Sequence, residues 1–483
     1  MASIEPHHGT RVFQSAEEAA IARFRSTSAA GLVIPIAEND LPNGYAFDRP
    51  FQILKASDAA GLPDEVKEEV DSFYDQTPNA IVVSLVKKGT TAAETTAAMV
   101  GDFSRKTGVH SLLKASSLGL SRPKLIPTAG YATTAAADGI ASVAVTTPGA
   151  GYSARTTITV AGTTGQGAVL TPVIGDEGAI TAVAVAKPGW GYTGDLVFTI
   201  NDPGGEGTGA TFTGTIGQTL NPILAEMIGV AEKLRAMIYT DGPDSTNEAA
   251  VQARQLIGSK RVAYCDPRVL KSIGGIPYPR PSSTIYAGLQ ARMDKEFGPH
   301  YPGSNVVING ITGVNRPIEY GDEANYLNFA RVNTIINRAN IDGAGGFRAW
   351  GAWTCADNEL WQFINVVRVT DLVNEAVEEG FLQFNDRPQT RARIDFMVMS
   401  GRNTLKRLEG EDGMLLPGSD FWLLDGQTAD DGVQGILKFG MKFEVPAPII
   451  DLRISALRNY TVAYELLYDS VTGRIEVGDI IAA

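Results

Sequence analysis

An internal repeat in the middle of the chain constrains the fold most strongly. The stretch GIASVAVTTPGAGYSARTTITVAG is echoed by GAITAVAVAKPGWGYTGDLVFTI, and the two Pro-Gly-x-Gly-Tyr elements begin at Pro148 and Pro188. A repeat of about 40 residues is one supersecondary unit. Each copy holds alternating β-branched residues, a Pro-Gly turn and a second alternating run, which predicts paired strands. Residues 133–216 are therefore predicted to form a small all-β insertion. The alternative, a flexible linker, fits this regular alternation less well.

The sequence on both sides of the insertion alternates strand-like and helix-like runs. AAGLVIPIAEN, IVVSLVKKG and SKRVAYCDP are typical of buried strands, whereas AETTAAMVGDF, GVHSLLKASS and NPILAEMIGVAEKLR are typical of helices. Such alternation indicates an α/β layer. Ser245 and Glu248 have the spacing of a capping box at the start of one helix. We predict one α/β domain, built from residues 31–132 and 217–335.

The C-terminal third has a different pattern. Residues 375–408 are predicted to be helical, with a break at 386–388. In GILKFGMKFEVPAP, alternate residues fall on opposite faces of a strand, with Phe439, Met441, Phe443 and Val445 on the apolar face. DLRISALRNYTVAYELL continues in strand-like fashion, and the tail GRIEVGDIIAA alternates again.

These patterns predict an α/β and α+β multidomain chain with the all-β insertion inside it. The predicted parts outside the α/β domain and the insertion are an N-terminal arm with its linker (1–30), a C-terminal core (336–470) and a C-terminal arm (471–483).

Composition and motifs exclude several classes of function. The net charge of −13 disfavours nucleic acid as a partner, because phosphate binding needs clustered Lys and Arg. No apolar run is long enough to span a bilayer, and the first residues lack the pattern of a secretory signal, so we expect no membrane insertion. The sequence has no P-loop, HExxH or GxSxG motif, and adjacent His7 and His8 are a weak metal signal. We therefore predict no catalytic residues, no cofactor, no metal site and no enzyme activity.

Two further features have open interpretations. Cys265 and Cys355 belong to no ligand cluster. They are either two buried thiols or a crosslink within or between subunits. Arg391, Arg402 and Lys406 share one face of a predicted helix, opposite Ile394, Val398, Leu405 and Leu408. That basic face is either solvated or a strip that docks on an acidic surface.

At this point the sequence resembles a known family. DGAGGFRAWGAWTCADNELWQFINVVRVTDLV resembles the DG-[FY]-R-x-W-G-x-R-T signature of contractile tail sheath proteins, with Trp353 where many members carry Arg. AEKLRAMIYTDGPDSTNEAAVQARQLIGSKRVAYCDPRV is similar to the sheath of R-type pyocins. HHGTRVF, INGITGVNRPIEY and KFEVPAP are also similar to family stretches. The likeness covers most of the chain outside 133–216.

The resemblance implies a structural function without catalysis. Sheath subunits form hexameric rings, stacked helically around an inner tube, and contraction drives the tube through a bacterial envelope. The implied partners are further copies of the chain, the tail tube protein, and baseplate and tail terminator or neck proteins. The implied location is the virion tail, assembled in the host cytoplasm. A tailocin or a related injection system is the alternative within this class. A surface-binding protein that uses the repeat, or a hydrolase or redox enzyme, explains less of the chain.

The resemblance also assigns roles to residues. Arms from neighbouring subunits are expected to complete a C-terminal β-sheet by strand addition. We place the receiving strands at 436–447 and 451–467, and the arms at 10–25 and 471–481. The arm candidates are Arg11, Val12, Phe13, Ile475, Val477 and Ile480. Arg391, Arg402 and Lys406 become the candidates that face the tube.

The signature stretch is expected to be packing rather than chemistry. Its tryptophans would fill a core between a sheet and a helix that begins near Glu359, and Arg348 would be paired or stacked there. The residues expected in this core are Phe347, Arg348, Trp350, Gly351, Trp353, Thr354 and Trp361. The insertion at 133–216 is expected to project from the outer surface of the assembly.

Overall fold

The computed structural model describes residues 27–133, 136–204, 206–338, 346–410, 413–456, and 458, 464, 466–468 and 471–472. It divides into two units, Met1–Ala447 and Pro448–Ala483. The predicted N-terminal arm residues Arg11, Val12 and Phe13, and the C-terminal arm residues Ile475, Val477 and Ile480, lie outside the described residues.

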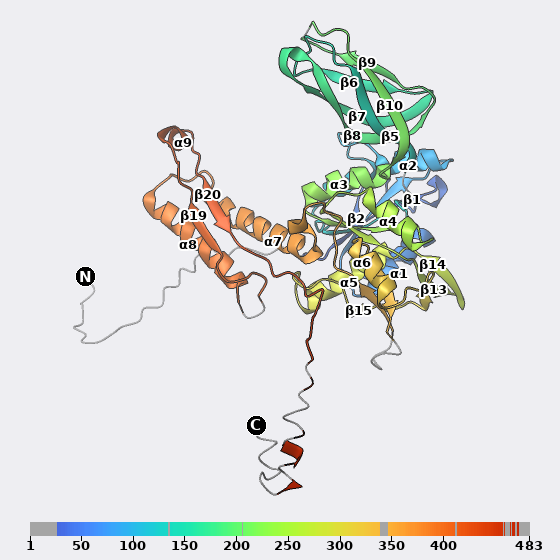
Figure 1. Cartoon of the computed structure of the whole chain (residues 1–483), viewed down its shortest axis with the longest axis vertical. Coiled ribbons are helices and arrows are strands. Elements are labelled where there is room, and N and C mark those ends of the chain that lie inside the picture. The colour runs from blue at the N-terminus through green and yellow to red at the C-terminus, as the bar shows by residue number, and fades with distance from the viewer. Residues whose placement is uncertain are drawn as a thin grey trace, which may run out of the picture. The chain divides into compact units, whose positions relative to one another are not determined.

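A six-stranded sheet forms the centre of the first unit (Figure 1). Its strands are parallel except for the edge strand β2. Apolar runs that are buried on both sides, such as AGLVIPI in β1, suit a parallel sheet covered by helices on both faces. The strand order is β12 (Val262–Cys265), β11 (Met237–Asp241), β4 (Leu125–Pro127), β1 (Ala30–Ile36), β3 (Ile81–Lys87) and β2 (Phe51–Ile53).

Helices cover both faces of this sheet and create two cores. One core packs under α1 (Asp64–Tyr74) and α5 (Ser283–Glu296). The other packs under α2 (Ala92–Val100), the 3-10 helix η3 (Gly108–Lys114), α3 (Pro222–Leu234), α4 (Asn247–Gln255) and α6 (Asp322–Phe329). This arrangement confirms the predicted α/β layer.

One local prediction about this layer is confirmed and another is wrong. GVHSLLK is helical as predicted and forms the 3-10 helix η3. Helix α4 is capped by Thr246, whose side chain accepts a hydrogen bond from the backbone N–H of Ala249 at 3.1 Å, and not by Ser245. The cap moves by one residue because either hydroxyl can cap a helix, and the sequence does not choose between neighbours.

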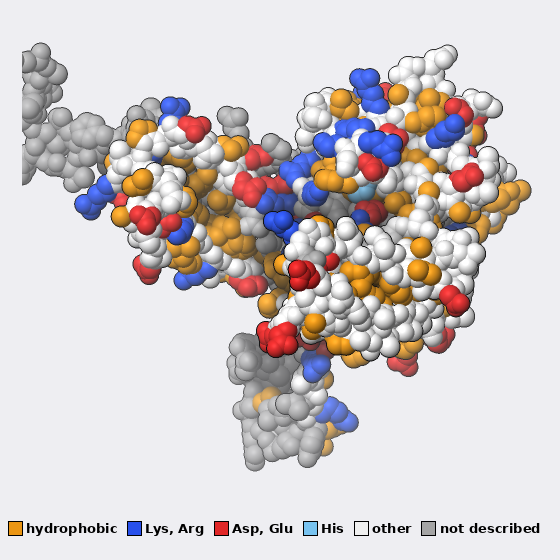
Figure 2. Space-filling model, turned by 90° about the horizontal axis from the view of Figure 1, so that it is seen from above, with side chains coloured by type: hydrophobic (Ala, Val, Ile, Leu, Met, Phe, Trp, Pro, Cys, Tyr) orange, Lys and Arg blue, Asp and Glu red, His pale blue; other side chains and the backbone are white. Residues whose placement is uncertain are grey.

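A β module interrupts the layer between β4 and α3 (Figure 1). Strand β5 pairs with β10, β7 with β8, and β6 with β9, all antiparallel. The last strand ends at Thr219, beyond the predicted limit of 216. Figure 2 looks onto this module, whose surface is mostly uncharged. The strands are β5 (Ala136–Thr147), β6 (Thr157–Ala161), β7 (Thr164–Ile174), β8 (Ile180–Thr193), β9 (Val197–Asn201) and β10 (Thr211–Thr219).

Two three-stranded sheets flank the central layer. The first joins β14 (Ile276–Arg280), β13 (Val269–Ile273) and β16 (Gly313–Val314). The second joins β15 (Val306–Val307), β18 (Phe347–Trp350) and β17 (Thr334–Asn337). The predicted division between residues 335 and 336 therefore differs from the structure, because it falls inside β17.

The C-terminal part of the first unit forms a lobe with its own core. It contains α7 (Ile364–Phe381), α8 (Arg391–Leu408), β19 (Asp420–Leu423), α9 (Ala429–Val433) and β20 (Phe439–Lys442). Phe439, Met441 and Phe443 pack against this core, and Val445 is buried in it. Lys442 and Glu444 are exposed. The predicted alternation is therefore confirmed.

The second unit differs from its prediction. Residues 451–456 form no strand, and positions 464, 466–468 and 471 are helical. The predicted receiving strand at 451–467 is therefore wrong for the described residues, and the predicted C-terminal core of 336–470 ends at Ala447. An alternating run becomes a strand only when a partner strand completes its ladder, and among the described residues no strand pairs with 451–456. Within the described ranges, none of the helices combines the length and apolarity that a bilayer-spanning helix needs.

Candidate functional site at helices α7 and α8

The carboxyl edge of the central sheet is where open α/β folds usually bind ligands. Here the chain places its own groups there. Asp241 ends β11 and is 1% exposed. Its Oδ1 accepts a hydrogen bond from the backbone N–H of Ser283 at 2.8 Å, and its Oδ2 accepts one from that of Gly130 at 3.0 Å. Ser283 begins α5, so an internal carboxylate occupies a helix N-terminus that would otherwise suit an anion.

A second buried carboxylate lies on α1. Glu69 is 5% exposed and accepts a hydrogen bond from the Thr284 hydroxyl, while Arg280 lies 3.5 Å away. Burial raises the pKa of Glu69 to about 7, although Thr284 and Arg280 oppose this shift. The folded state thus holds a proton on Glu69 that the unfolded chain releases at lower pH.

This raised pKa predicts a stability that falls with rising pH. Between about pH 4.5 and pH 7 the folded protein binds more protons at Glu69 than the unfolded chain, so its free energy of unfolding decreases by about 2–3 kcal/mol across that window. Glu69→Gln should flatten the curve in that window and stabilise the protein at pH 8. Urea unfolding at several pH values measures this, with exposed Glu65→Gln as the control. An unchanged slope in Glu69→Gln would contradict the assignment.

Helix α7 belongs to two cores at once. Ile364 and Val367 near its start are buried in the core under α1 and α5. Val369 and Val373 are buried in the core of the C-terminal lobe. Because one continuous helix supplies both cores, it mechanically couples the lobe to the α/β layer.

The tightest contact of α7 with the layer is a buried ion pair. Arg368 and Asp294 form two hydrogen bonds, at 2.6 Å from Nη1 and 2.5 Å from Nη2, and both side chains are almost completely buried. Nη2 of Arg368 also donates to the backbone oxygen of Thr27 at 2.9 Å. The bidentate geometry and the extra acceptor offset the cost of removing both charges from water.

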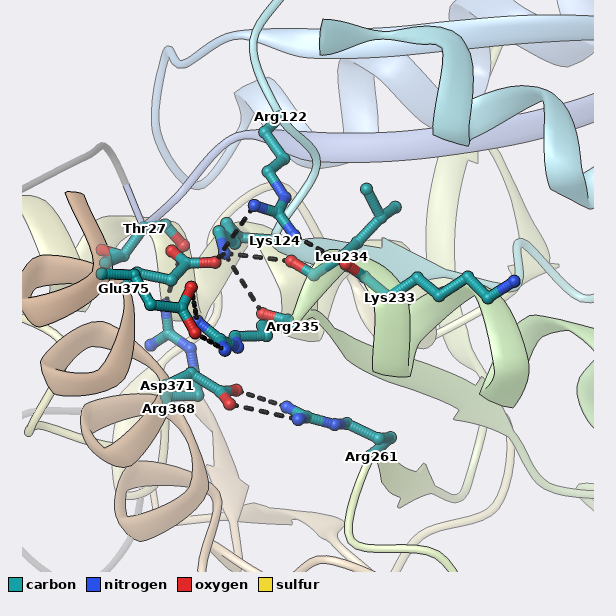
Figure 3. Close-up of polar contacts among 11 residues, drawn as sticks. Thr27, Arg122, Lys124, Lys233, Leu234, Arg235, Arg261, Arg368, Asp371 and Glu375 are labelled. Carbon is teal, nitrogen blue, oxygen red and sulfur yellow. Dashed lines mark hydrogen bonds and ion pairs between the residues drawn. The ribbon is translucent and has the colours of Figure 1, made fainter. Parts of the chain in front are cut away.

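Further charges follow along the same face of α7 (Figure 3). Asp371 pairs with Arg261 of the layer, and Glu375 accepts a hydrogen bond from Lys124 at 2.5 Å. Burial lowers the pKa of Lys124, and the Glu375 carboxylate opposes that shift. Glu378 pairs with Arg235 at 2.8 Å. We call this contact the α7 seam; its residues on α7 are Arg368, Asp371, Glu375 and Glu378.

Sequence reasoning missed the α7 seam, although a signal for it was present. Positions 368, 371, 375 and 378 are spaced by three or four residues, so they share one helical face. A charged stripe on a helix that is otherwise apolar normally indicates a solvated face. Here the stripe is largely buried, because it packs against the α/β layer. Its partners are Arg261, Lys124 and Arg235, which are distant from α7 in sequence and therefore give no local signal.

Helix α8 brings together the three cations predicted to share a face. Arg391, Arg402 and Lys406 are all exposed. Each also has a nearby carboxylate: Arg402 pairs with Asp420 at 2.8 Å, Lys406 with Glu409 at 2.8 Å, and Arg391 lies 3.9 Å from Asp395. On the apolar face predicted from the sequence, Leu405 and Leu408 are buried, whereas Ile394 and Val398 are only partly buried. The exposed face is therefore a mixture of both charges.

The signature residues do not form one tryptophan core. Trp350 packs at the margin of the core under α3, and Trp361 at the margin of the core under α1 and α5. The Trp353 and Phe363 rings lie 5.0 Å apart at a tilt of 34°, and the Trp353 indole N–H donates to Asn328 at 2.9 Å. All three are only partly buried, because buried small residues, among them Ala349, fill the interior.

The other signature residues are held by backbone contacts. Thr354 is fully buried and donates to the backbone oxygen of Trp361 at 2.6 Å. Arg348 was expected inside that tryptophan core, but it is only partly buried and donates to the backbone oxygen of Asn305 at 3.0 Å. Gly351 has a φ of 125°, which favours glycine, and Phe347 packs against the core under α1. The 3-10 helix Glu359–Trp361 precedes α7, close to the predicted helix start.

Cys265 and Cys355 are free, buried thiols. Cys265 belongs to the core on one face of the central sheet and Cys355 to the core on the other. Burial raises the pKa of Cys355 to about 12, which keeps it a thiol. A disulfide stays a prediction for these residues, and a bridge to another subunit would need the layer to open.

Comparison with known proteins shows what this chain is similar to. Residues 212–355 match the model of the phage tail sheath protein central domain. A putative prophage major tail sheath protein of Pseudomonas aeruginosa (strain UCBPP-PA14) is 37% identical over 200 residues, which are 40% of this chain and 50% of that protein. The tail sheath protein of Burkholderia phage BcepMu is 30% identical over 250 residues, covering 48% of this chain and 51% of that protein.

Residues 212–355 of this chain therefore match a phage tail sheath central domain, and the chain is similar to tail sheath proteins of phages and a prophage. It spans about half the length of these curated relatives. Solved structures share the sheath fold. The helical sheath of the anti-feeding prophage in its contracted state has a TM-score of 0.58 at 14% identity, covering 93% of this chain and 98% of that chain. The PVC sheath complex of an extracellular contractile injection system, also contracted, has a TM-score of 0.57 at 13% identity, covering 95% and 99%.

Proposed function

We propose that this sheath chain is a structural subunit of a contractile phage or phage-like tail. Copies of it would stack as hexameric rings around an inner tube and drive that tube through a bacterial envelope. Its partners would be further copies of itself, the tail tube protein, the baseplate and a tail terminator, and it would reside in the virion tail after assembly in the host cytoplasm. The observation that carries this proposal is the sheath central domain together with a C-terminal unit whose apolar side chains are uncovered.

The exposed apolar side chains support assembly with another copy. In the unit Pro448–Ala483, Ile449 is 83% exposed, Leu452 74% and Ile454 81%. A run of large apolar residues left in water costs free energy that a partner surface recovers. We therefore propose that the C-terminal arm begins near Pro448 rather than at residue 471.

The receiving surface would be the hairpin of β19 and β20. Among the described residues, no third strand extends this sheet. Phe421 and Phe439 lie on one face of the hairpin, and their stacked rings have centroids 5.4 Å apart. Both rings pack in the core that α7 and α8 also form. Two-stranded sheets gain stability from added strands, and backbone hydrogen bonds at a strand edge accept an extended peptide. A strand from a neighbouring copy would therefore complete this sheet.

The exposed face of α8 would contact the tube. Its cations pair with carboxylates on the same lobe, and such exposed pairs are individually weak. They can therefore exchange partners with a tube surface and be released together during contraction.

Charge reversal tests this contact. The triple substitution of Arg391, Arg402 and Lys406 by Glu should weaken binding to the cognate tube by at least about tenfold, because three attractions become repulsions. The matched control reverses three exposed cations of the α/β layer, Arg105, Lys106 and Lys233. Sedimentation of each variant with preformed tubes measures binding. Equal loss in both variants would contradict a specific role for α8.

Negative-stain electron microscopy of the purified chain tests the proposed function itself. Hollow striated polymers are expected. Discrete particles, at every concentration and in the presence of tube, would reject the sheath role.

A further inference from the structure

The β module is built from two units that complete one another. Tyr152 of the first Pro-Gly-x-Gly-Tyr element accepts a hydrogen bond from the backbone N–H of Ala210, at 3.1 Å from its hydroxyl. The Tyr192 hydroxyl of the second element accepts a hydrogen bond from the backbone N–H of Ala168 at 3.2 Å. Each tyrosine therefore binds the Gly-x-Gly-Ala loop of the other unit, which is 207–210 for Tyr152 and 165–168 for Tyr192. These loops need glycine, because a Cβ on Gly165 would lie 2.5 Å from the Tyr192 ring, and one on Gly207 2.1 Å from the Tyr152 ring.

The pairing in the middle of the module is equally reciprocal. Strands β6 and β9 pair so that Thr159 lies opposite Thr199, its counterpart in the repeat. Ile158 pairs with Leu170, and their counterparts Phe198 and Phe212 have ring centroids 5.7 Å apart. These side chains form a core separate from the two cores of the α/β layer. The module thus has its own closed interior.

Among the described residues, one of the two equivalent ends of the module contacts the layer through side chains. Lys187 pairs with Glu226 of α3 at 2.5 Å, and Trp190 packs against the core beneath α3. Glu226 uses its other oxygen for His110 of η3, at 3.3 Å from Nε2. At the opposite end the counterparts of Lys187 and Trp190 are Thr147 and Ala150, and both are exposed. The repeat has therefore diverged at one end into a docking surface.

We propose that Lys187, Trp190 and Glu226 form a latch, and that the module undocks from the layer as an intact body when the latch opens. The module can separate without unfolding because its core and its reciprocal tyrosine contacts are internal. The latch is small, since one ion pair and one partly buried indole carry it. Every contact lies within one chain, so the inference holds whether or not the chain polymerises.

Hydrogen exchange on the full chain tests the latch. Lys187→Met removes the ion pair, and Lys187→Met with Trp190→Ala removes both contacts. The matched control is Thr147→Met at the equivalent free end. The latch variants should speed amide exchange in η3 and in the first half of α3 by at least about tenfold, while β6 and β9 keep their wild-type protection. The control should change neither region.

Two outcomes would overturn the proposal. Unchanged exchange in η3 and α3 of both latch variants would show that docking does not depend on these residues. Faster exchange in β6 and β9 together with α3 would show that the module unfolds when it leaves the layer. Because Trp190 also packs over Gly167, the Lys187→Met variant alone decides between undocking and unfolding if the double variant loses the module's fold.

Discussion

Arg368→Ala should lower the free energy of unfolding by about 3–5 kcal/mol, the largest effect that we expect from any single substitution in this chain. The guanidinium is almost completely buried. It donates two hydrogen bonds to the Asp294 carboxylate and one to the backbone oxygen of Thr27. Its removal leaves the Asp294 carboxylate buried without its cation. Chemical unfolding followed by tryptophan fluorescence measures the change.

A control from the same seam makes this prediction specific. Arg235 pairs with Glu378, whose side chain is 62% exposed, so Arg235→Ala should cost no more than about 1 kcal/mol. The double variant Arg368→Met with Asp294→Leu should recover much of the lost stability, because it leaves no unpaired buried charge. A loss of less than about 1 kcal/mol in Arg368→Ala would show that the pair does not stabilise α7 on the layer.

Deletion of residues 448–483 should abolish polymer formation while the first unit stays folded. Among the residues that the structure describes, none from the deleted unit belongs to the four cores of the first unit. Its exposed apolar side chains are the ones we propose to be covered by another copy. Thermal unfolding of the truncated chain should therefore resemble that of the full chain, and light scattering should report monomers only.

A substitution series separates the deletion from a simple loss of solubility. Leu452→Asp and Ile454→Asp should each weaken polymerisation, and the double variant should weaken it further. The neighbouring polar substitutions Asp451→Asn and Arg453→Gln are controls and should leave polymerisation unchanged. Wild-type polymers formed by the truncated chain would contradict the role of this unit.

Parts of the fold that depend on local pattern were predictable from sequence. Apolar runs such as Ala30–Ile36 and Ile81–Lys87, alternating with helical patterns, indicated an α/β layer, and a regular repeat indicated the β module. The alternation of Phe439 and Met441 predicted one face of β20. These patterns are local because strand and helix periods are written in neighbouring residues.

Features that depend on distant contacts were not predictable. The α7 seam exists because Arg261 and Lys124 approach a helix more than a hundred positions away in the sequence. The tryptophans were expected inside a core, yet small residues such as Ala349 and Ala352 occupy it, and which side chain enters a core depends on the space between elements. The segment 451–456 has a strand-like pattern, but it is not a strand and pairs with no strand among the described residues.

The most direct test of the central claim is a cryo-electron-microscopy reconstruction of the polymer formed by the full chain. The account predicts a hollow helical assembly in which residues 448–483 of one copy lie against the β19–β20 hairpin of another, with α8 facing the lumen. A reconstruction in which these residues fold back on their own chain, or a sample that contains only discrete particles, would contradict it.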